Sequence, residues 1–235
     1  MIKKKNLIFA IVGVLLVLVG TFFVFSYWND NDEIEEPITV TWNLDIYTAT
    51  NLSEIINESS IIVKGEYSEL IGTENMFRNP ENLSEGDPDH YVEGRIYQFD
   101  ISEVLHGVVN EESIPVIMHY SEEVNVEVEE RGISEVVEVI NPLFVEPEFG
   151  QEYILFLNYS NDVDSFFGPI EPYALLVNEE NLENISPLFN EPENTIQPFQ
   201  TDEGDIIEVY TPLSNIEEDP FNNMTLDQLV DAINE

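Results

Sequence analysis

The chain has no cysteine among its 235 residues. This absence excludes disulfide bonds, thiolate metal ligands, thiol nucleophiles and lipid attachment through a cysteine. A domain of about 200 residues buries a hydrophobic core without such cross-links, because the buried fraction of the surface rises with chain length. We therefore expect packing, rather than covalent bonds, to stabilise the fold.

Basic residues are also scarce. The sequence contains 7 Lys and Arg against 48 Asp and Glu, which gives a formal net charge of −41. After the first five positions the only bases are Lys64, Arg78, Arg95 and Arg131. Binding to nucleic acid depends on basic side chains that neutralise phosphates, so we exclude nucleic acid as a partner.

The N-terminal segment reverses this balance. Three lysines at positions 3–5 precede Leu7–Phe25, an apolar run without a charged residue, and Tyr27 and Trp28 follow it. At ~1.5 Å per residue the run forms a helix of about 28 Å, close to the ~30 Å of a bilayer core. Basic residues mark the cytoplasmic side of a membrane helix, and aromatic residues gather at the interface.

We therefore predict an uncleaved anchor that makes the lipid bilayer a partner of the chain. The alternative is a cleaved secretory signal, which has a shorter apolar region and ends in a small-x-small site. No such site follows this run. The predicted protein is single-pass, with its N-terminus in the cytoplasm. Its parts are a basic end (1–6), a transmembrane signal-anchor (7–28), an acidic linker (29–37) and an extracytoplasmic acidic β domain (38–235).

The predicted domain shows mostly the period of β-strands. Ile38, Val40, Trp42, Leu44 and Ile46 alternate with polar residues, as in a half-buried strand. Similar patterns predict strands at 61–67, 96–105, 114–120, 124–128, 136–140, 154–157, 173–177 and 206–210.

The segments between the strands are of two kinds. Residues 71–93 lack periodicity and are expected to form a long loop. Two short helices are expected at 51–58 and from Thr225 to Ile233, because each begins with the spacing of a capping box.

This order of elements predicts a mainly β fold, either an antiparallel barrel or a sandwich, with two short helices. Strands do not alternate with long helices, which disfavours a doubly wound parallel sheet. No repeat of fixed period occurs, which disfavours a solenoid or a propeller.

Three stretches carry a resemblance to known proteins: SSIIVKGEY (59–67), YQFDISEVLHG (97–107) and FGQEYILFL (149–157). Their succession, over roughly residues 52–177, resembles uncharacterised secreted and membrane-anchored β-rich proteins of Gram-positive bacteria. The resemblance implies a compact extracytoplasmic domain and no particular activity. The order is also loosely similar to netrin-like, OB-type barrels. The chain lacks the cysteines of that group, so the metalloproteinase inhibition known there is not expected.

Known catalytic motifs do not indicate a particular reaction for this sequence. The sequence contains neither a G-x-S-x-G nucleophile elbow nor a glycine-rich phosphate loop. His90 lies beside Asp87 and Asp89 and is the auxiliary candidate for a metal or acid–base cluster, against the alternative of a solvated loop histidine. His106 is expected in a turn, and His119 on the wetter face of its strand.

Among so many acids, one group conflicts with strand pairing. If residues 123–140 form a hairpin with Glu127 and Glu129 opposite Glu135 and Glu138, like charges face one another, which destabilises a sheet. These four glutamates are the candidate site for a cation, with Ca²⁺ as the candidate ion, or for a cationic partner outside the cell. Simple solvation is the alternative.

The function predicted from these features is a non-catalytic binding or interaction module, with a dependence on cations as an option. The alternative is an extracytoplasmic hydrolase that acts through carboxylates, with His90 as auxiliary group. A buried pair of acids with a histidine in one pocket would favour the enzyme. A broad exposed acidic face would favour binding.

Overall fold

The structure is a computed structural model that describes residues 37–129, 131–190, 194–201, 204–213, 216 and 218–234. The predicted anchor (7–28) and nearly all of the predicted acidic linker (29–37) lie outside the described residues. Within the described ranges, no helix is both long enough and apolar enough to span a bilayer.

The described chain is mainly β, as predicted, with two short helices, α2 (Leu52–Glu58) and α3 (Leu226–Ile233). The strands are β1 (Ile38–Thr41), β2 (Ile61–Asn75), β3 (Arg78–Asn79), β4 (Asn82–Gly86), β5 (Val92–His106), β6 (Ser113–Val128), β7 (Ile133–Ile140), β8 (Glu152–Ser160), β9 (Ser165–Phe167), β10 (Ala174–Asn178), β11 (Asn181–Asn184), β12 (Thr195–Gln200) and β13 (Ile206–Thr211).

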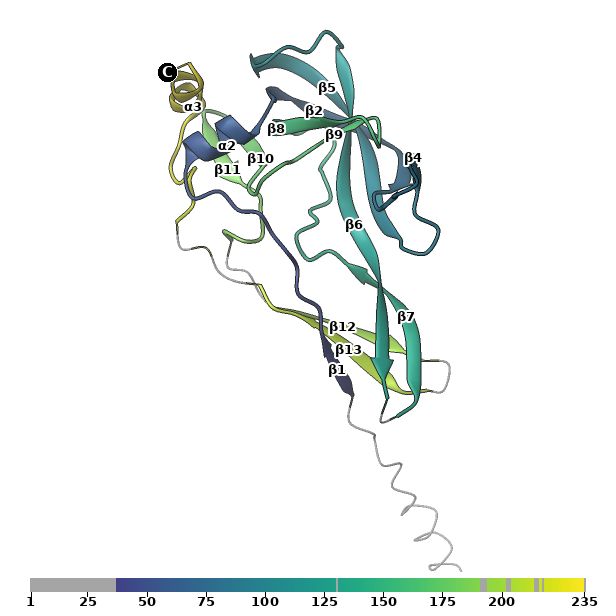
Figure 1. The fold of residues 1–235 in the computed structure, drawn as a ribbon. Helices are drawn as coiled ribbons and strands as arrows, with labels where there is room; N and C mark the ends of the chain where they lie inside the picture. The colour runs from purple at the N-terminus through teal and green to yellow at the C-terminus, as the bar shows by residue number, and fades with distance from the viewer. Residues whose placement is uncertain are drawn as a thin grey trace, which may run out of the picture. The chain divides into compact units, whose positions relative to one another are not determined.

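The largest sheet has the order β11-β10-β8-β2-β5-β6-β7, and all neighbours in it are antiparallel. Strand β9 lies off this path and pairs with both β6 and β8. The pairings β8-β2-β5-β6-β9 therefore return to β8 and form a closed cycle (Figure 1).

A first core consists mainly of side chains from these five strands. Tyr67 lies at its centre, with its ring 5.0 Å from Phe99, 5.3 Å from Tyr153 and 5.9 Å from Tyr97 between centroids, each in an edge-to-face arrangement. This geometry is favoured between aromatic rings because the positive edge of one meets the negative face of another.

A second core lies on the other face of β2 and β8. Ile62 and Phe156 contribute from these strands, Ile55 from α2 and Leu229 from α3, and all four are fully buried. Both helices begin with the expected caps: Asn51 accepts a hydrogen bond from the Glu54 N–H, and Thr225 forms a full capping box with Gln228. These helices thus cover the side of the sheet that faces away from the aromatic core.

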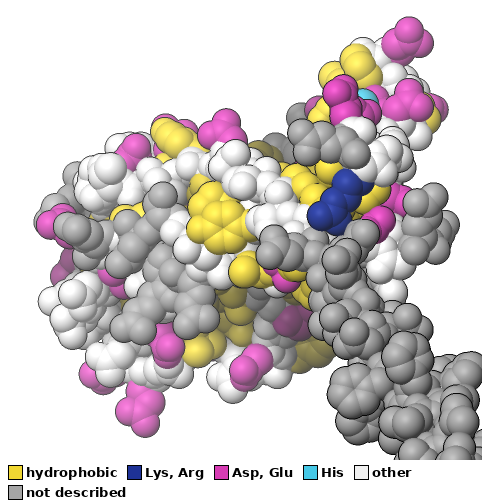
Figure 2. Space-filling view, turned by 90° about the horizontal axis from the view of Figure 1, so that it is seen from below, with side chains coloured by type: hydrophobic (Ala, Val, Ile, Leu, Met, Phe, Trp, Pro, Cys, Tyr) yellow, Lys and Arg dark blue, Asp and Glu magenta, His cyan; other side chains and the backbone are white. Residues whose placement is uncertain are grey.

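A third core joins the end of the β6–β7 hairpin to a small sheet of order β1-β13-β12. Val126 and Val139 of the hairpin pack with Ile207 and Val209 of β13, and all four are buried. Strand β1 is parallel to β13. On the face seen in Figure 2, hydrophobic side chains gather near the middle and acidic side chains are spread around them.

The predicted loop at 71–93 is wrong. Strand β2 continues to Asn75, β5 begins at Val92, and the short hairpin β3–β4 lies between them. The register of β2 with β5 shifts between Tyr67 and Glu69 and again between Leu70 and Gly72. Such bulges change which residues share a face, so the alternation that marks a strand in the sequence disappears.

Two glycines of β2 provide a test of this packing. A Cβ on Gly65 would lie 2.1 Å from the backbone oxygen of Asp100, whereas a Cβ on Gly72 would meet no atom within 4 Å. We expect Gly65→Ala to lower the free energy of unfolding by about 2 kcal/mol or more, because the backbone of β5 has to move. We expect Gly72→Ala to change it by less than about 0.5 kcal/mol.

Urea denaturation of the full chain in a neutral detergent, followed by circular dichroism, measures both values. Equal losses in the two variants would contradict the close approach of β2 and β5 at Gly65.

Candidate functional site

The β6–β7 hairpin does not gather the four candidate glutamates on one face. Glu127 lies opposite Ser134, and Glu135 lies opposite the buried Val126 on the inner face of the hairpin. The expected pairing of Glu127 and Glu129 with Glu135 and Glu138 is therefore wrong.

One pair of like charges does occur on the outer face. Glu138 lies directly opposite Glu123, and its carboxylate accepts a hydrogen bond of 2.7 Å from Ser121. In the described part of the chain, no group of three or more His, Asp and Glu side chains has the arrangement of a metal site. Cation binding by these glutamates stays a prediction.

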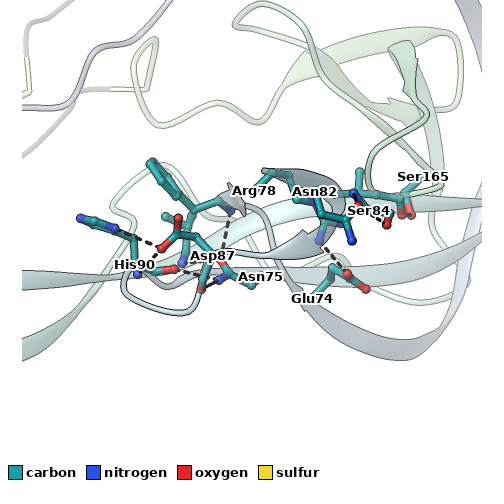
Figure 3. A network of polar contacts seen from close by, with 11 residues as sticks. Glu74, Asn75, Arg78, Asn82, Ser84, Asp87, His90 and Ser165 are labelled. Atoms are coloured by element: carbon teal, nitrogen blue, oxygen red, sulfur yellow. Dashed lines mark hydrogen bonds and ion pairs between the residues drawn. The ribbon is translucent and has the colours of Figure 1, made fainter. Parts of the chain in front are cut away.

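His90 takes part in a local network where β2 ends and β5 begins. Its Nδ1 lies 3.2 Å from Asp87 Oδ1, and its side chain is 61% exposed. Asn75 donates through Nδ2 to the backbone oxygens of Asp87 and His90 and so holds this turn (Figure 3).

The surroundings of His90 favour the carboxylate form of Asp87. The Asp89 N–H donates to Asp87 Oδ1 at 2.8 Å and lowers the pKa of that carboxyl. The His90 side chain lowers this pKa further. These bonds order the turn. His90 is not among the lining residues of any cavity described below.

His119 has an intermediate exposure, between the buried Met118 and the partly buried Tyr120. Its Nε2 atom is buried and has no hydrogen-bond partner within the described residues, which the expected wetter face did not predict. Burial lowers the pKa of the imidazole, and a hydrogen bond with the Ser121 backbone acts in the opposite direction. Asn141 fixes the backbone here, because its Nδ2 donates to the His119 oxygen at 3.2 Å.

Glu171 is the second polar group at this place. It lies between the buried residues Ile170 and Pro172. Its N–H donates to the Tyr47 oxygen at 2.9 Å, and its own backbone oxygen accepts from the Ala49 N–H at 2.8 Å. These bonds tie residues 47–49 to the segment before β10, where Glu171 has an intermediate exposure.

Burial raises the pKa of Glu171 to about 7, because the charged form loses hydration. Ser186 lowers it in part, although the Ser186 hydroxyl forms no hydrogen bond of ordinary geometry with any described residue. At neutral pH the carboxyl is thus close to half ionised. A carboxyl in this state either accepts or releases a proton with little change in free energy.

His119 and Glu171 line the same two cavities. One has a volume of about 310 Å³. The other, of about 150 Å³, lies against Met118 and Tyr173. The larger cavity is also bordered by Asp45, Tyr47 and Asn141, and by apolar residues: Leu44, Ile46, Leu143, Pro169 and Ile170. We refer to the larger space as the His119–Glu171 cavity.

Sequence reasoning missed this site because nothing in a list of 48 acids marks Glu171. The available signal was its isolation: within SFFGPIEPYALLVN (165–178) it is the only charged residue. A single carboxyl in an apolar stretch is more often buried than one in an acidic loop. The buried position of the His119 Nε2 atom carried no comparable signal.

Comparison of the chain with protein-family models, with curated proteins and with solved structures finds no match in any of the three. The resemblance to uncharacterised proteins of Gram-positive bacteria therefore stays a prediction.

The raised pKa of Glu171 predicts a particular effect of pH on stability. In the unfolded chain this carboxyl loses its proton near pH 4.5, whereas in the folded protein it keeps the proton up to about pH 7. Its contribution therefore reduces stability as the pH rises between these values. We expect Glu171→Gln to match the wild type at pH 4.5 and to exceed it at pH 8 by up to about 3 kcal/mol, from ~1.4 kcal/mol per pKa unit.

Urea denaturation at several pH values between 4.5 and 8 measures this difference. Glu69→Gln removes one exposed carboxylate of β2 and serves as the control for lost charge, so its profile should run parallel to that of the wild type. A Glu171→Gln profile that also runs parallel to the wild type would contradict the buried carboxyl.

Proposed function

We propose that the chain is a membrane-tethered module whose extracytoplasmic β domain binds a ligand in the His119–Glu171 cavity. The observation that carries the proposal is the state of the polar groups there. His119 Nε2 is buried without a partner, and Glu171 is desolvated in the same space. A buried polar group without a partner costs ~1–3 kcal/mol, so a ligand group that reaches His119 Nε2 recovers that free energy.

A barrel form of the fold agrees with such a site. The closed cycle β8-β2-β5-β6-β9 encloses the aromatic core, which supports the barrel alternative over an open sheet. The cavity then lies outside this core, next to β6 and the segment before β10. His119, on strand β6, thereby lies in the same lining as residues of connecting segments. Connecting segments are common positions for binding residues.

The exposed acids are weaker candidates for the binding site. They are spread over the surface seen in Figure 2, and the β6–β7 hairpin places Glu135 on a different face from Glu127. Their combined charge still favours the approach of cations from a distance.

A second candidate, the carboxylate-based hydrolase, is favoured by one observation. Glu171, with a pKa of about 7, shares a cavity with a histidine, as in a general acid–base site. In this form of the proposal His119 replaces His90 as the auxiliary group, because His90 lies on the exposed turn beside Asp87.

The tether predicts a defined orientation. We expect a C-terminal epitope on the full chain to be removed by protease added to sealed right-side-out vesicles, because the three N-terminal lysines keep that end inside. Replacing Lys3, Lys4 and Lys5 by glutamine should leave a fraction of the epitopes protected. Immunoblots before and after protease treatment measure both. An epitope that is digested only after detergent opens the wild-type vesicles would contradict the orientation.

The three histidines of the chain make ligand binding at the cavity directly observable. In the full chain labelled at histidine, NMR of the imidazole rings gives three signals, and His119→Gln identifies that of His119. We expect fragments that enter the cavity to shift the His119 signal and to leave those of His90 and His106 in place.

Fragments of cationic, anionic, neutral polar and apolar character cover the possible ligands. Chemical conversion of a bound fragment, lost in Glu171→Gln, would support the hydrolase over the binding module. Absence of any His119 shift across all four classes, or shifts confined to His90, would contradict the proposed site.

A further inference from the structure

We infer that the His119–Glu171 cavity accepts a primary ammonium group on an apolar stem, as in a lysine side chain or a free alkylamine. This inference rests on the proposed function and specifies the chemical class of its ligand. It follows from the hydrogen-bonding character of the lining, its charge and the nature of its walls.

Once Glu171 is ionised, the polar groups of the cavity are mainly acceptors. The acidic residues Glu171 and Asp45 line it together with His119, whose buried Nε2 lacks a partner within the described residues. Because burial lowers the pKa of His119, its ring is neutral at pH 7, and one nitrogen of a neutral imidazole is an acceptor. The Ser121 backbone acts on the pKa of His119 in the opposite direction to burial.

Neighbouring amide groups do not change this character. Asn141 uses its Nδ2 on the His119 backbone oxygen and its Oδ1 on the Leu143 N–H. None of the described residues that line the cavity is a lysine or an arginine. An ammonium group brings three donors and a positive charge and therefore matches this lining, whereas a carboxylate or phosphate would meet two acids.

The walls fit an apolar stem. Ile46, Leu143, Pro169 and Ile170 border the cavity together with Tyr47, whose side chain is 57% exposed. The exposed tyrosine indicates that solvent, and hence a ligand, reaches this side. Its ring adds a surface that attracts cations. A volume of about 310 Å³ accommodates a short alkylamine or the end of a lysine side chain.

The charge of Glu171 sets the pH at which binding develops. The ammonium ion favours the ionised carboxylate, so affinity should rise by about tenfold between pH 6 and pH 8, as a carboxyl with a pKa of about 7 ionises. The other titratable groups that border this carboxyl are Asp45, Tyr47 and His119 in the cavity and Tyr173 from the smaller one. Burial lowers the pKa of His119 and raises that of Tyr173, so both stay neutral through this range.

Calorimetric titration of the full chain in a neutral detergent tests the inference. The compounds are n-butylammonium, n-butanol, butyrate and n-propylguanidinium, with Nα-acetyl-lysine N-methylamide and spermidine to separate the two sources of an amine. We expect n-butylammonium to bind at least tenfold more tightly than the other three small compounds. Tighter binding of the lysine derivative would identify a protein partner, and tighter binding of spermidine a free polyamine.

Two variants test whether the binding of n-butylammonium depends on Glu171. Glu171→Gln should weaken n-butylammonium at least tenfold at pH 8 and remove the rise in affinity between pH 6 and 8. Glu69→Gln, which removes an exposed carboxylate outside the cavity, should change neither. The ring signals of His90 and His106 report whether the Glu171→Gln variant keeps the fold.

Several results would overturn the inference. They are equal binding of n-butanol or n-propylguanidinium, and n-butylammonium affinity that Glu171→Gln leaves unchanged. A shift of the His119 signal by a neutral or anionic fragment alone would overturn the inference of an amine ligand while leaving the binding cavity in place. If n-butylammonium does not bind and no fragment shifts the His119 signal, the cavity is rejected as a site.

Discussion

The structure depends on the pairing of β2 along both of its edges. Residues 62–66 of this strand pair with β8 on one side and with β5 on the other, and alternate side chains enter different cores. Ile61 and Val63 pack with the aromatic core, and Ile62 packs with the helices. Because both faces and both edges are satisfied, β2 is the element that fixes β5 and β8 in place. The close approach at Gly65 is a consequence of this position.

The candidate cavity follows from how the chain returns to this framework. Residues 47–49 and Glu171 bond to each other through their backbones, which brings the segment before α2 against the segment before β10. The two segments have no regular ladder beyond this contact, so side chains rather than strands fill the space beside β6. A cavity between connecting segments and a rigid strand is a common position for a ligand.

Much of the β content could be predicted, since burial and strand period coincide where one face of a strand is wet. Ile38, Val40 and Trp42 are half-buried and alternate with exposed residues, as expected, although β1 ends at Thr41. The prediction failed where bulges shift the register, as after Tyr67, and where a strand is as short as β9. The site could not be predicted, because it depends on contacts between residues 45, 119 and 171, which are far apart in the sequence.

Desolvation raises the pKa of two described carboxyls, Glu122 and Glu171, and the shift is large only at Glu171. Most acids here retain water, and each of them is interchangeable with its neighbours as a contribution to the net charge. Glu171 has lost part of that water, so its ionisation depends on what occupies the cavity beside it. A cation there restores the stabilisation that water gives to an exposed carboxylate, and it does so only at this position. Under our proposal, the same acidity that makes the surface carboxylates uninformative draws cations toward the chain, and the Glu171 carboxyl determines where one of them binds.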